Sequence, residues 1–398
     1  MKKRILAILL VITLAAALAA CGGQAPAPAQ PAQPAQPAQP TPPADAAPDL
    51  TPVRIAVAAP MTGDHAQYGL GFWQAVQLQV DAWNEAGGVL GRPVEAIQFD
   101  DQSSLEEGAA IAERIAADPS IIGVIGHFTS GVAMTASPTY NENQIINISP
   151  SASHPDFGVD QDYIFRNNTV IHVEAAAGLD IAVGLGYTQI GILSIMTDWG
   201  VSTSEIVTNL IAEHPTLTLV GHEEITEGTV DFSPAITALH NAGAEVIICV
   251  SMYNVLAPFA VQYQPVNPDI QIIGFSNAYT HNLIALGGDA VEGVRFPVSF
   301  FAGSPAPHVQ SFVQRYIERF GESPSALTAQ AYDSAGMIFQ AIEEAGGTDD
   351  RAAIRAALAN IAYYGVTGEP PTRFTPEGDV IRAFTKVMVQ NGAFVPAT

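Results

Sequence analysis

Two short serine-bearing loops hold the side chains best suited to chemistry. One, residues 126–131, includes Ser130, and the other, residues 149–155, includes Ser151 and Ser153. The first loop lies between an apolar run and a helical pattern, and a helix N-terminus offers unpaired N–H groups and a positive dipole to an anion. The Ser130 hydroxyl adds a directed donor. This loop predicts a site for a small anion, with a simple N-cap role for Ser130 as the alternative.

Residues that could support catalysis or hold a cofactor do not form the patterns that such chemistry needs. Phe128 precedes Ser130 where the G-x-S-x-G elbow of hydrolases requires glycine. His127 and His154 have no further metal ligands at suitable spacing. The Gly-x-Gly at 69–71 lacks the third glycine of a dinucleotide-binding loop. We therefore expect no enzyme activity, no catalytic residue, no cofactor and no metal.

Composition limits the class of partner. Nucleic-acid binding requires a basic surface, and the net charge is −24, so we expect this chain not to bind nucleic acid. The body beyond the N-terminal region has about 350 residues, more than a single hydrophobic core usually serves, which predicts two domains. The two cysteines are Cys21 and Cys249. Cys249 lies in an apolar run and is interpreted as a small core residue.

The N-terminus has the pattern of an export signal. Basic residues precede an apolar stretch at 5–18, which is shorter than the ~20 apolar residues that span a bilayer. The stretch ends in Leu-Ala-Ala-Cys at 18–21, which resembles the bacterial lipobox. The resemblance implies a signal peptide over 1–20 and lipidation of Cys21, with an ordinary signal peptide as the alternative. Residues 21–50, rich in Ala, Pro and Gln, predict an extended tether.

Strand and helix patterns alternate along the body. Continuous apolar strands that alternate with helices favour parallel sheets covered on both faces, and two such series predict two α/β lobes. Ligands of such sheets bind beyond the carboxyl ends of the strands, where both serine loops lie. The expected strands are 53–57, 94–99, 121–125, 145–148, 190–195, 217–225, 246–250, 270–275 and 384–389, and the expected helices are 72–83, 105–117, 132–140, 201–212, 233–241, 256–263 and most of 308–362.

Four loop motifs occur in order along the body: P-M-T-G-D-H-A-Q-Y-G at 60–69, N-E-A-G-G-V-L-G-R-P-V-E at 84–95, V-I-G-H-F-T-S at 124–130 and I-S-P-S-A-S-H-P at 148–155. Together they resemble the leucine/isoleucine/valine-binding proteins, which are type I periplasmic binding proteins and solute receptors of ABC transporters. The resemblance spans roughly 53–389. It implies two Rossmann-like lobes with parallel sheets, joined by a three-strand hinge, that close over one ligand.

The resemblance also implies how the chain divides. Lobe I would comprise 51–168 plus 300–363, and lobe II would comprise 169–299 plus 364–398. The three crossovers between the lobes would lie near 166–170, 293–301 and 364–370.

The resemblance assigns roles to residues of the first lobe. Ser130 would hold the carboxylate of the ligand. The loop with Ser151, Ala152 and Ser153 would supply a backbone carbonyl and a hydroxyl to an ammonium group, and an N–H to the carboxylate. A plain Pro-Ser turn is the alternative for this loop. Tyr68 would belong to the aromatic wall of the pocket, with core packing as its alternative.

Lobe II would complete the pocket with Trp199 and Tyr253 as further aromatic walls, again with core packing as the alternative for each. The family's acidic partner of the ammonium group falls at Ser276, a neutral residue. Since a buried ammonium without a charged partner is costly, this departure puts the amino-acid specificity in question. Asp198 could supply the missing charge from another direction.

We therefore predict a lipid-anchored receptor on the extracytoplasmic face of the cell membrane. It would act as a monomer and pass a small carboxylate ligand to ABC permease subunits. The expected ligand is a branched-chain or other small amino acid. The alternatives are an aromatic or deaminated acid, and an amide- or urea-type ligand bound for sensing.

Overall fold

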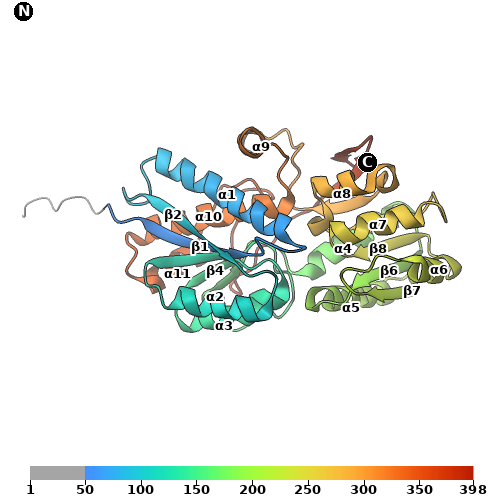
Figure 1. Cartoon of the computed structure of the whole chain (residues 1–398), viewed down its shortest axis with the longest axis horizontal. Helices are drawn as coiled ribbons and strands as arrows, with labels where there is room; N and C mark the ends of the chain where they lie inside the picture. Colours follow the sequence, from blue (N-terminus) through green and yellow to red (C-terminus); the bar gives the residue numbers. More distant parts are fainter. Residues whose placement is uncertain (1–49, 398) are drawn as a thin grey trace, which may run out of the picture. The chain divides into compact units, whose positions relative to one another are not determined.

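Two mainly parallel β-sheets, formed by different stretches of the chain, organise the protein (Figure 1). The computed structural model describes residues 50–397. The predicted signal peptide, Cys21 and the linker up to residue 49 therefore lie outside the described residues. The described residues belong to one compact unit.

The first sheet has five parallel strands in the order β2-β1-β3-β4-β5, which is a doubly wound arrangement. Four of the strands were expected from the sequence, and the three-residue β5 is an addition at the start of the first predicted crossover. The strands are β1 (Val53–Ala59), β2 (Val94–Asp100), β3 (Ile121–Gly126), β4 (Ile146–Ser149) and β5 (Ile164–Arg166).

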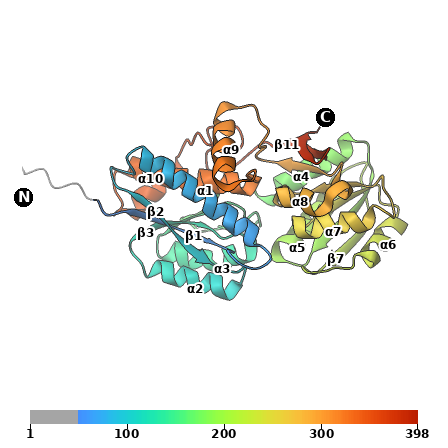
Figure 2. The same cartoon turned by 45° about the horizontal axis from the view of Figure 1, so that its top comes forward.

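Both faces of this sheet are covered by helices. In β1, Ile55 and Val57 belong to one core cluster, whereas Ala56 and Ala58 belong to another, because successive strand residues point to opposite faces. The first cluster continues into α1 (Ala66–Glu85) and α10 (Ala326–Ala345), and the second into α2 (Leu105–Ala116) and α3 (Ser130–Glu142). We call this body lobe I. It also includes α9 (Pro307–Phe320), which packs on α1, and α11 (Arg351–Ala359), which packs on α10 (Figure 2).

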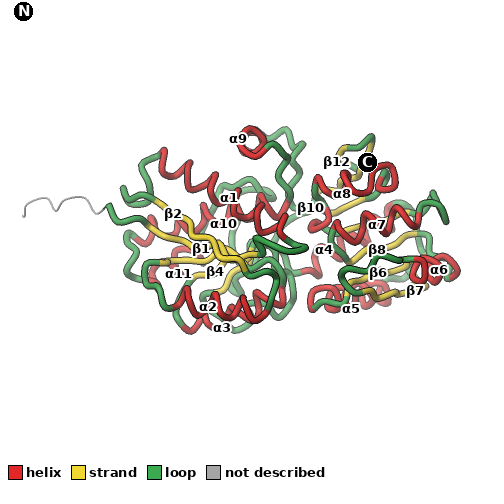
Figure 3. The backbone as a smooth tube through the Cα atoms, in the orientation of Figure 1, coloured by secondary structure: helices red, strands yellow, loops and turns green. Residues whose placement is uncertain are grey.

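The second sheet has seven strands in the order β12-β11-β10-β9-β8-β6-β7, and its body is called lobe II. Its strands are β6 (Gln189–Ile195), β7 (Thr218–Ile225), β8 (Val246–Val250), β9 (Gln271–Gly274), β10 (Arg295–Val298), β11 (Thr385–Gln390) and β12 (Ala393–Pro396). Its helices are α4 (Ile171–Gly184), α5 (Asp198–Glu213), α6 (Ser233–Asn241), α7 (Tyr253–Tyr263) and α8 (His281–Gly287), with short 3₁₀ turns at Ser276–Ala278 and Gly288–Val291. Figure 3 shows helices on both sides of these strands. Cys249 is fully buried in β8, as expected for a core residue.

One edge of the second sheet departs from the parallel pattern. Strand β11 runs antiparallel to β10, and β12 runs antiparallel to β11. The turn between β11 and β12 is Asn391-Gly392, and both residues have positive φ. Such an Asn-Gly pair is the preferred two-residue hairpin turn, so this hairpin had a local signal that the sequence analysis did not use.

The three predicted crossovers lie where the chain passes between the lobes. Gly368 of the third donates its N–H to the carbonyl of Ser299 in the second at 2.9 Å. The guanidinium of the buried Arg382 donates to the carbonyl oxygen of Asn167 in the first at 2.9 Å. The first bond joins the second and third crossovers, and the second bond joins the first crossover to Arg382, which follows the third along the chain. The residue boundaries of the two lobes stay a prediction.

Candidate functional site

A cavity of about 800 Å³ lies between loops of the two lobes. Lobe I contributes the loops that follow β2, β3 and β4, and lobe II those that follow β6, β7, β8 and β9. These are the carboxyl ends of the strands, as expected for an α/β site. Five of the eight predicted ligand-binding residues line the cavity: Ser130, Ser151, Ser153, Trp199 and Ser276.

Ser130 is the first residue of α3 and lies in the cavity wall. The N-cap is Thr129, whose hydroxyl accepts from the N–H of Val132, so the N-cap alternative for Ser130 was wrong. The hydroxyl of Ser130 is thus not needed to cap the helix. Together with the N-terminus of α3, it presents donors to the cavity and suits an anion.

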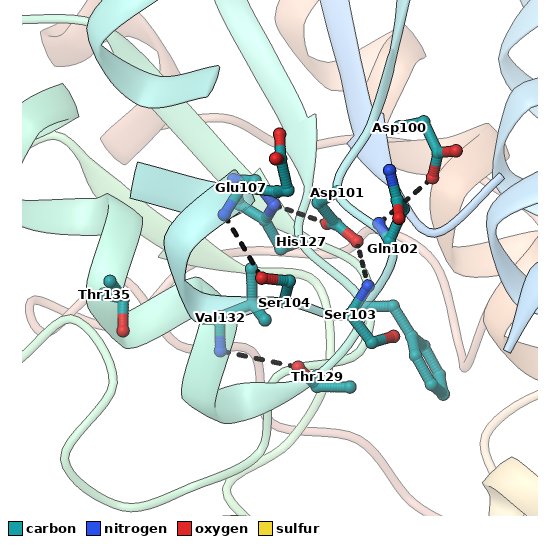
Figure 4. Close-up of polar contacts among 12 residues, drawn as sticks. Asp100, Asp101, Gln102, Ser103, Ser104, Glu107, His127, Thr129, Val132 and Thr135 are labelled. Atoms are coloured by element: carbon teal, nitrogen blue, oxygen red, sulfur yellow. Dashed lines mark hydrogen bonds and ion pairs between the residues drawn. The ribbon is translucent and has the colours of Figure 1, made fainter. Parts of the chain in front are cut away.

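A buried network supports the Ser130 loop from behind (Figure 4). The Nδ1 atom of His127 lies 2.6 Å from a carboxylate oxygen of Asp101, and its Nε2 atom lies 3.1 Å from the hydroxyl of Tyr140. The other oxygen of Asp101 accepts from the N–H of Ser103 at 2.9 Å. Asp101, His127 and Tyr140 are buried and their polar groups are paired, so the network holds the loop in place.

The turn before His127 leaves no room for a side chain. Gly126 has φ +141°, and a Cβ atom there would lie 1.8 Å from the carbonyl oxygen of Ala58 in β1. Only glycine fits this conformation at this distance from a neighbouring strand. The approach brings the Ser130 loop directly onto the end of β1.

The second serine loop is joined to the first. The hydroxyl of Ser151 donates to the carbonyl oxygen of Phe128 at 2.7 Å, and that of Ser149 donates to the carbonyl of His127 at 3.0 Å. The hydroxyl oxygen of Ser153 accepts from the indole Nε1 of Trp199 at 3.0 Å. The Ser153 hydroxyl keeps its proton for a further acceptor, such as a ligand carboxylate.

Polar contacts beside the cavity cross from one lobe to the other. Besides the bond from Trp199 to Ser153, the Tyr68 hydroxyl donates to the carbonyl oxygen of Asn277 at 2.8 Å. The Nε2 atom of His65 lies 3.2 Å from a carboxylate oxygen of Glu227. The structure therefore has its lobes in contact around the cavity, which is the arrangement that encloses a ligand.

The other three predicted ligand-binding residues are not part of the cavity lining. Tyr68 stacks on Phe128, with ring centroids 4.1 Å apart, and lies beside Tyr253. Ala152 is buried, and its N–H donates to the Ser149 hydroxyl at 2.9 Å. These residues support the wall from behind. Their direct contact with a ligand stays a prediction.

Glu174 is a cavity residue that the sequence analysis did not select. It lies in the first turn of α4, is 3% exposed and lines the cavity. Its Oε1 atom accepts from the backbone N–H of Ser276 at 2.6 Å. Burial raises the pKa of Glu174 to about 7, and hydrogen bonds from Ser276 act in the opposite direction. Glu174 lies among the apolar residues of the buried face of α4, and an acid at such a position was the signal that the sequence offered.

The described residues that line the cavity include five carboxylates and neither Lys nor Arg. Four of the five are exposed, and Glu174 alone is buried. Asp198, the predicted alternative partner for an ammonium group, is exposed and extends toward Gly131, where an added Cβ would lie 2.4 Å from its Oδ2 atom. It therefore approaches the start of α3, on the side of the anion site. The remaining acids are Asp156, Glu205 and Glu227.

Comparison with known proteins identifies the family. The family described as periplasmic binding protein matches residues 52–393. This chain belongs to the periplasmic binding protein family. A Leu/Ile/Val-binding protein homolog from Brucella abortus is 27% identical to this periplasmic binding protein over 323 residues, which cover 80% of this chain and 85% of the relative.

Solved structures agree with this assignment. A candidate branched-chain amino acid ABC transporter protein from Rhodospirillum rubrum is 31% identical in sequence, with a TM-score of 0.68. The superposition covers 87% of this chain and 100% of the Rhodospirillum rubrum chain. A solute-binding protein from R. palustris in complex with benzoate shares the fold at 17% sequence identity, with a TM-score of 0.80. The superposition covers 87% of this chain and 95% of the R. palustris chain. The predicted family and fold class are confirmed, and this periplasmic binding protein is a solute-binding protein rather than an enzyme. No helix within residues 50–397 has the length and apolar character needed to cross a bilayer.

Proposed function

We propose that this protein is the extracytoplasmic receptor of an ABC importer and that it binds a small amino acid, foremost a branched-chain one. The observation that carries the proposal is the cavity between the lobes, into which lobe I presents the N-terminus of α3 with Ser130 and the hydroxyl of Ser153. These donors suit the carboxylate of an amino acid. The relative from Brucella abortus, named for Leu/Ile/Val binding, supports the same ligand class.

An aromatic acid is the second candidate ligand. The structural neighbour from R. palustris was crystallised with benzoate, and Phe128 and Trp199 line the cavity here. The carboxylate of an aromatic acid would bind at Ser130 and the N-terminus of α3 in lobe I. Such a ligand has no positive charge to pair with the acidic residues that lobe II contributes to the cavity. The two candidates therefore differ in whether the ligand carries a positive charge.

Closure of the lobes around the ligand is the first test. Because Trp199, Tyr68 and His65 make their cross-lobe contacts only when the lobes meet, saturation with L-leucine should lower the radius of gyration. Small-angle X-ray scattering of free and saturated protein measures this, and calorimetry establishes saturation. Leucine binding without compaction would contradict lobe closure. Failure of every amino acid and aromatic acid in a binding panel would contradict the receptor function itself.

Attachment to the membrane is proposed to rest on lipidation of Cys21, with the Pro- and Ala-rich segment as a tether that lets the receptor reach ABC permease subunits. Replacement of Cys21 by alanine should move nearly all of the protein from the membrane fraction to the soluble fraction. The affinity for leucine should stay unchanged, because the described residues that line the cavity begin at His65, far along the chain from Cys21. Fractionation followed by immunoblotting measures the first effect. Stable membrane association of the variant would contradict the anchor.

A further inference from the structure

Two unusual acceptor groups lie together on the lobe II side of the cavity. Glu174 is a buried carboxylate in the cavity wall, held by the backbone N–H of Ser276. The next residue, Asn277, also lines the cavity and is 8% exposed. Its Oδ1 atom is buried and has no hydrogen-bond partner within the described residues. The two residues belong to different elements of the cavity wall, α4 and the 3₁₀ turn at Ser276–Ala278.

Buried acceptors of this kind require donors. A buried carbonyl oxygen without a donor is destabilising, and a buried carboxylate with too few donors is more so. The described lining residues include neither Lys nor Arg, and the two histidines among them, His65 and His154, lie in loops of lobe I rather than beside Glu174 in lobe II. Solvent or a ligand must therefore provide the remaining donors, and an ammonium group, with three N–H donors and a positive charge, suits a buried carboxylate beside an amide oxygen.

We propose that Glu174 and the Asn277 side-chain oxygen bind an ammonium group of the ligand, so that the cavity selects amino acids over deaminated and aromatic acids. This inference rests on the proposed receptor function and specifies its ligand class. It assigns the counter-charge to α4, where the sequence analysis had considered only Ser276 and Asp198.

The other acids of the cavity are less suited to this role. Asp198 and Glu205 are exposed, so water screens their charge. Glu227 is exposed as well, and its carboxylate lies 3.2 Å from Nε2 of His65. Only Glu174 is removed from solvent, and a charge in such surroundings acts most strongly on a ligand cation.

The site predicts that binding depends on pH. Burial raises the pKa of Glu174 to about 7, opposed by the hydrogen bonds from Ser276. The elements packed on α4 are α5, β9 and β10, whose titratable groups are Asp198, Glu205, Glu213 and Arg295, and α4 itself carries His172 and Asp180. An ammonium group favours the ionised carboxylate, so binding should lower the pKa of Glu174 and release a proton. Affinity should therefore rise as pH increases through about 7.

The experiment compares matched ligands that differ in one group. Calorimetry is run with L-leucine against 4-methyl-2-oxopentanoate, and with L-phenylalanine against phenylpyruvate and benzoate. The wild-type protein should bind at least one amine at least tenfold more tightly than its deaminated partner. Its affinity for that amine should fall by about tenfold or more between pH 8 and pH 5.5, because Glu174 becomes protonated.

Two variants with the same chemical change separate Glu174 from the general acidity of the cavity. Glu174→Gln should weaken amine binding at pH 8 by about tenfold or more and flatten the pH profile, because the charge-assisted bond is lost. Glu205→Gln, at an exposed lining position, should keep the affinity within about threefold and keep the pH profile. Thermal unfolding of both variants establishes that they are folded.

Equal binding of amines and deaminated acids, or tighter binding of the acids, would overturn the inference while the receptor function stands. Equal losses in Glu174→Gln and Glu205→Gln would also overturn it, since they would indicate a diffuse electrostatic effect. Absence of binding by the whole panel would overturn the inference together with the proposed function.

Discussion

Replacement of Trp199 by alanine is expected to weaken leucine binding by about 30- to 1,000-fold, which corresponds to about 2–4 kcal/mol. Trp199 lines the cavity and is largely buried. Its ring meets that of Phe275 edge-on, with centroids 5.9 Å apart, and its indole N–H bridges to Ser153 of lobe I. The substitution therefore removes apolar area from the cavity wall and a contact that joins the lobes.

Trp199→Phe is the matched control because it retains an aromatic ring and removes the indole N–H. The loss of one neutral hydrogen bond should weaken binding only by about 3- to 10-fold. Titration calorimetry with leucine measures both variants. If Trp199→Ala bound leucine within about threefold of wild type, Trp199 would have no role in the ligand site.

Replacement of Asp333 by alanine is expected to lower the free energy of unfolding by about 3–5 kcal/mol. Asp333 is fully buried in α10, and its carboxylate accepts from the N–H of Val366 at 2.9 Å and from the N–H and hydroxyl of Thr367 at 2.9 and 2.5 Å. Burial raises the pKa of Asp333, and its hydrogen bonds from Thr367 and Val366, together with the nearby Arg382, act in the opposite direction. The variant would leave these donors unpaired and Arg382 without its counter-charge.

Asp333→Asn retains one acceptor oxygen and should therefore be less destabilising than the alanine variant. Denaturant unfolding in the absence of ligand gives the free energy for both. Since Val366 and Thr367 belong to the third crossover, the alanine variant should also loosen the hinge, which scattering of the free protein would detect as a larger radius of gyration. A loss below about 1 kcal/mol in Asp333→Ala would contradict a supporting role for this network.

Much of the architecture could be predicted from local patterns. The strands at Val246–Val250 and Ile121–Gly126 are continuous apolar runs, and a fully buried parallel strand requires this composition. The helix at Ser233–Asn241 was predicted with its observed bounds. By contrast, α7 begins at Tyr253, three residues before the expected start of this helix at residue 256.

The sequence by itself determined the two-lobed α/β class, the family and the serine loops of lobe I, because periodicity and short motifs are properties of neighbouring residues. Only the tertiary structure decided which acid of the cavity wall is buried. Glu174 and Ser276 are separated by 102 positions and meet because α4 packs beside β9 and β10. Asp198 is adjacent to the cavity residue Trp199 in sequence, yet its side chain is exposed and reaches toward Gly131. Burial and side-chain direction depend on how distant segments pack, and they determine which carboxylate can act on a ligand.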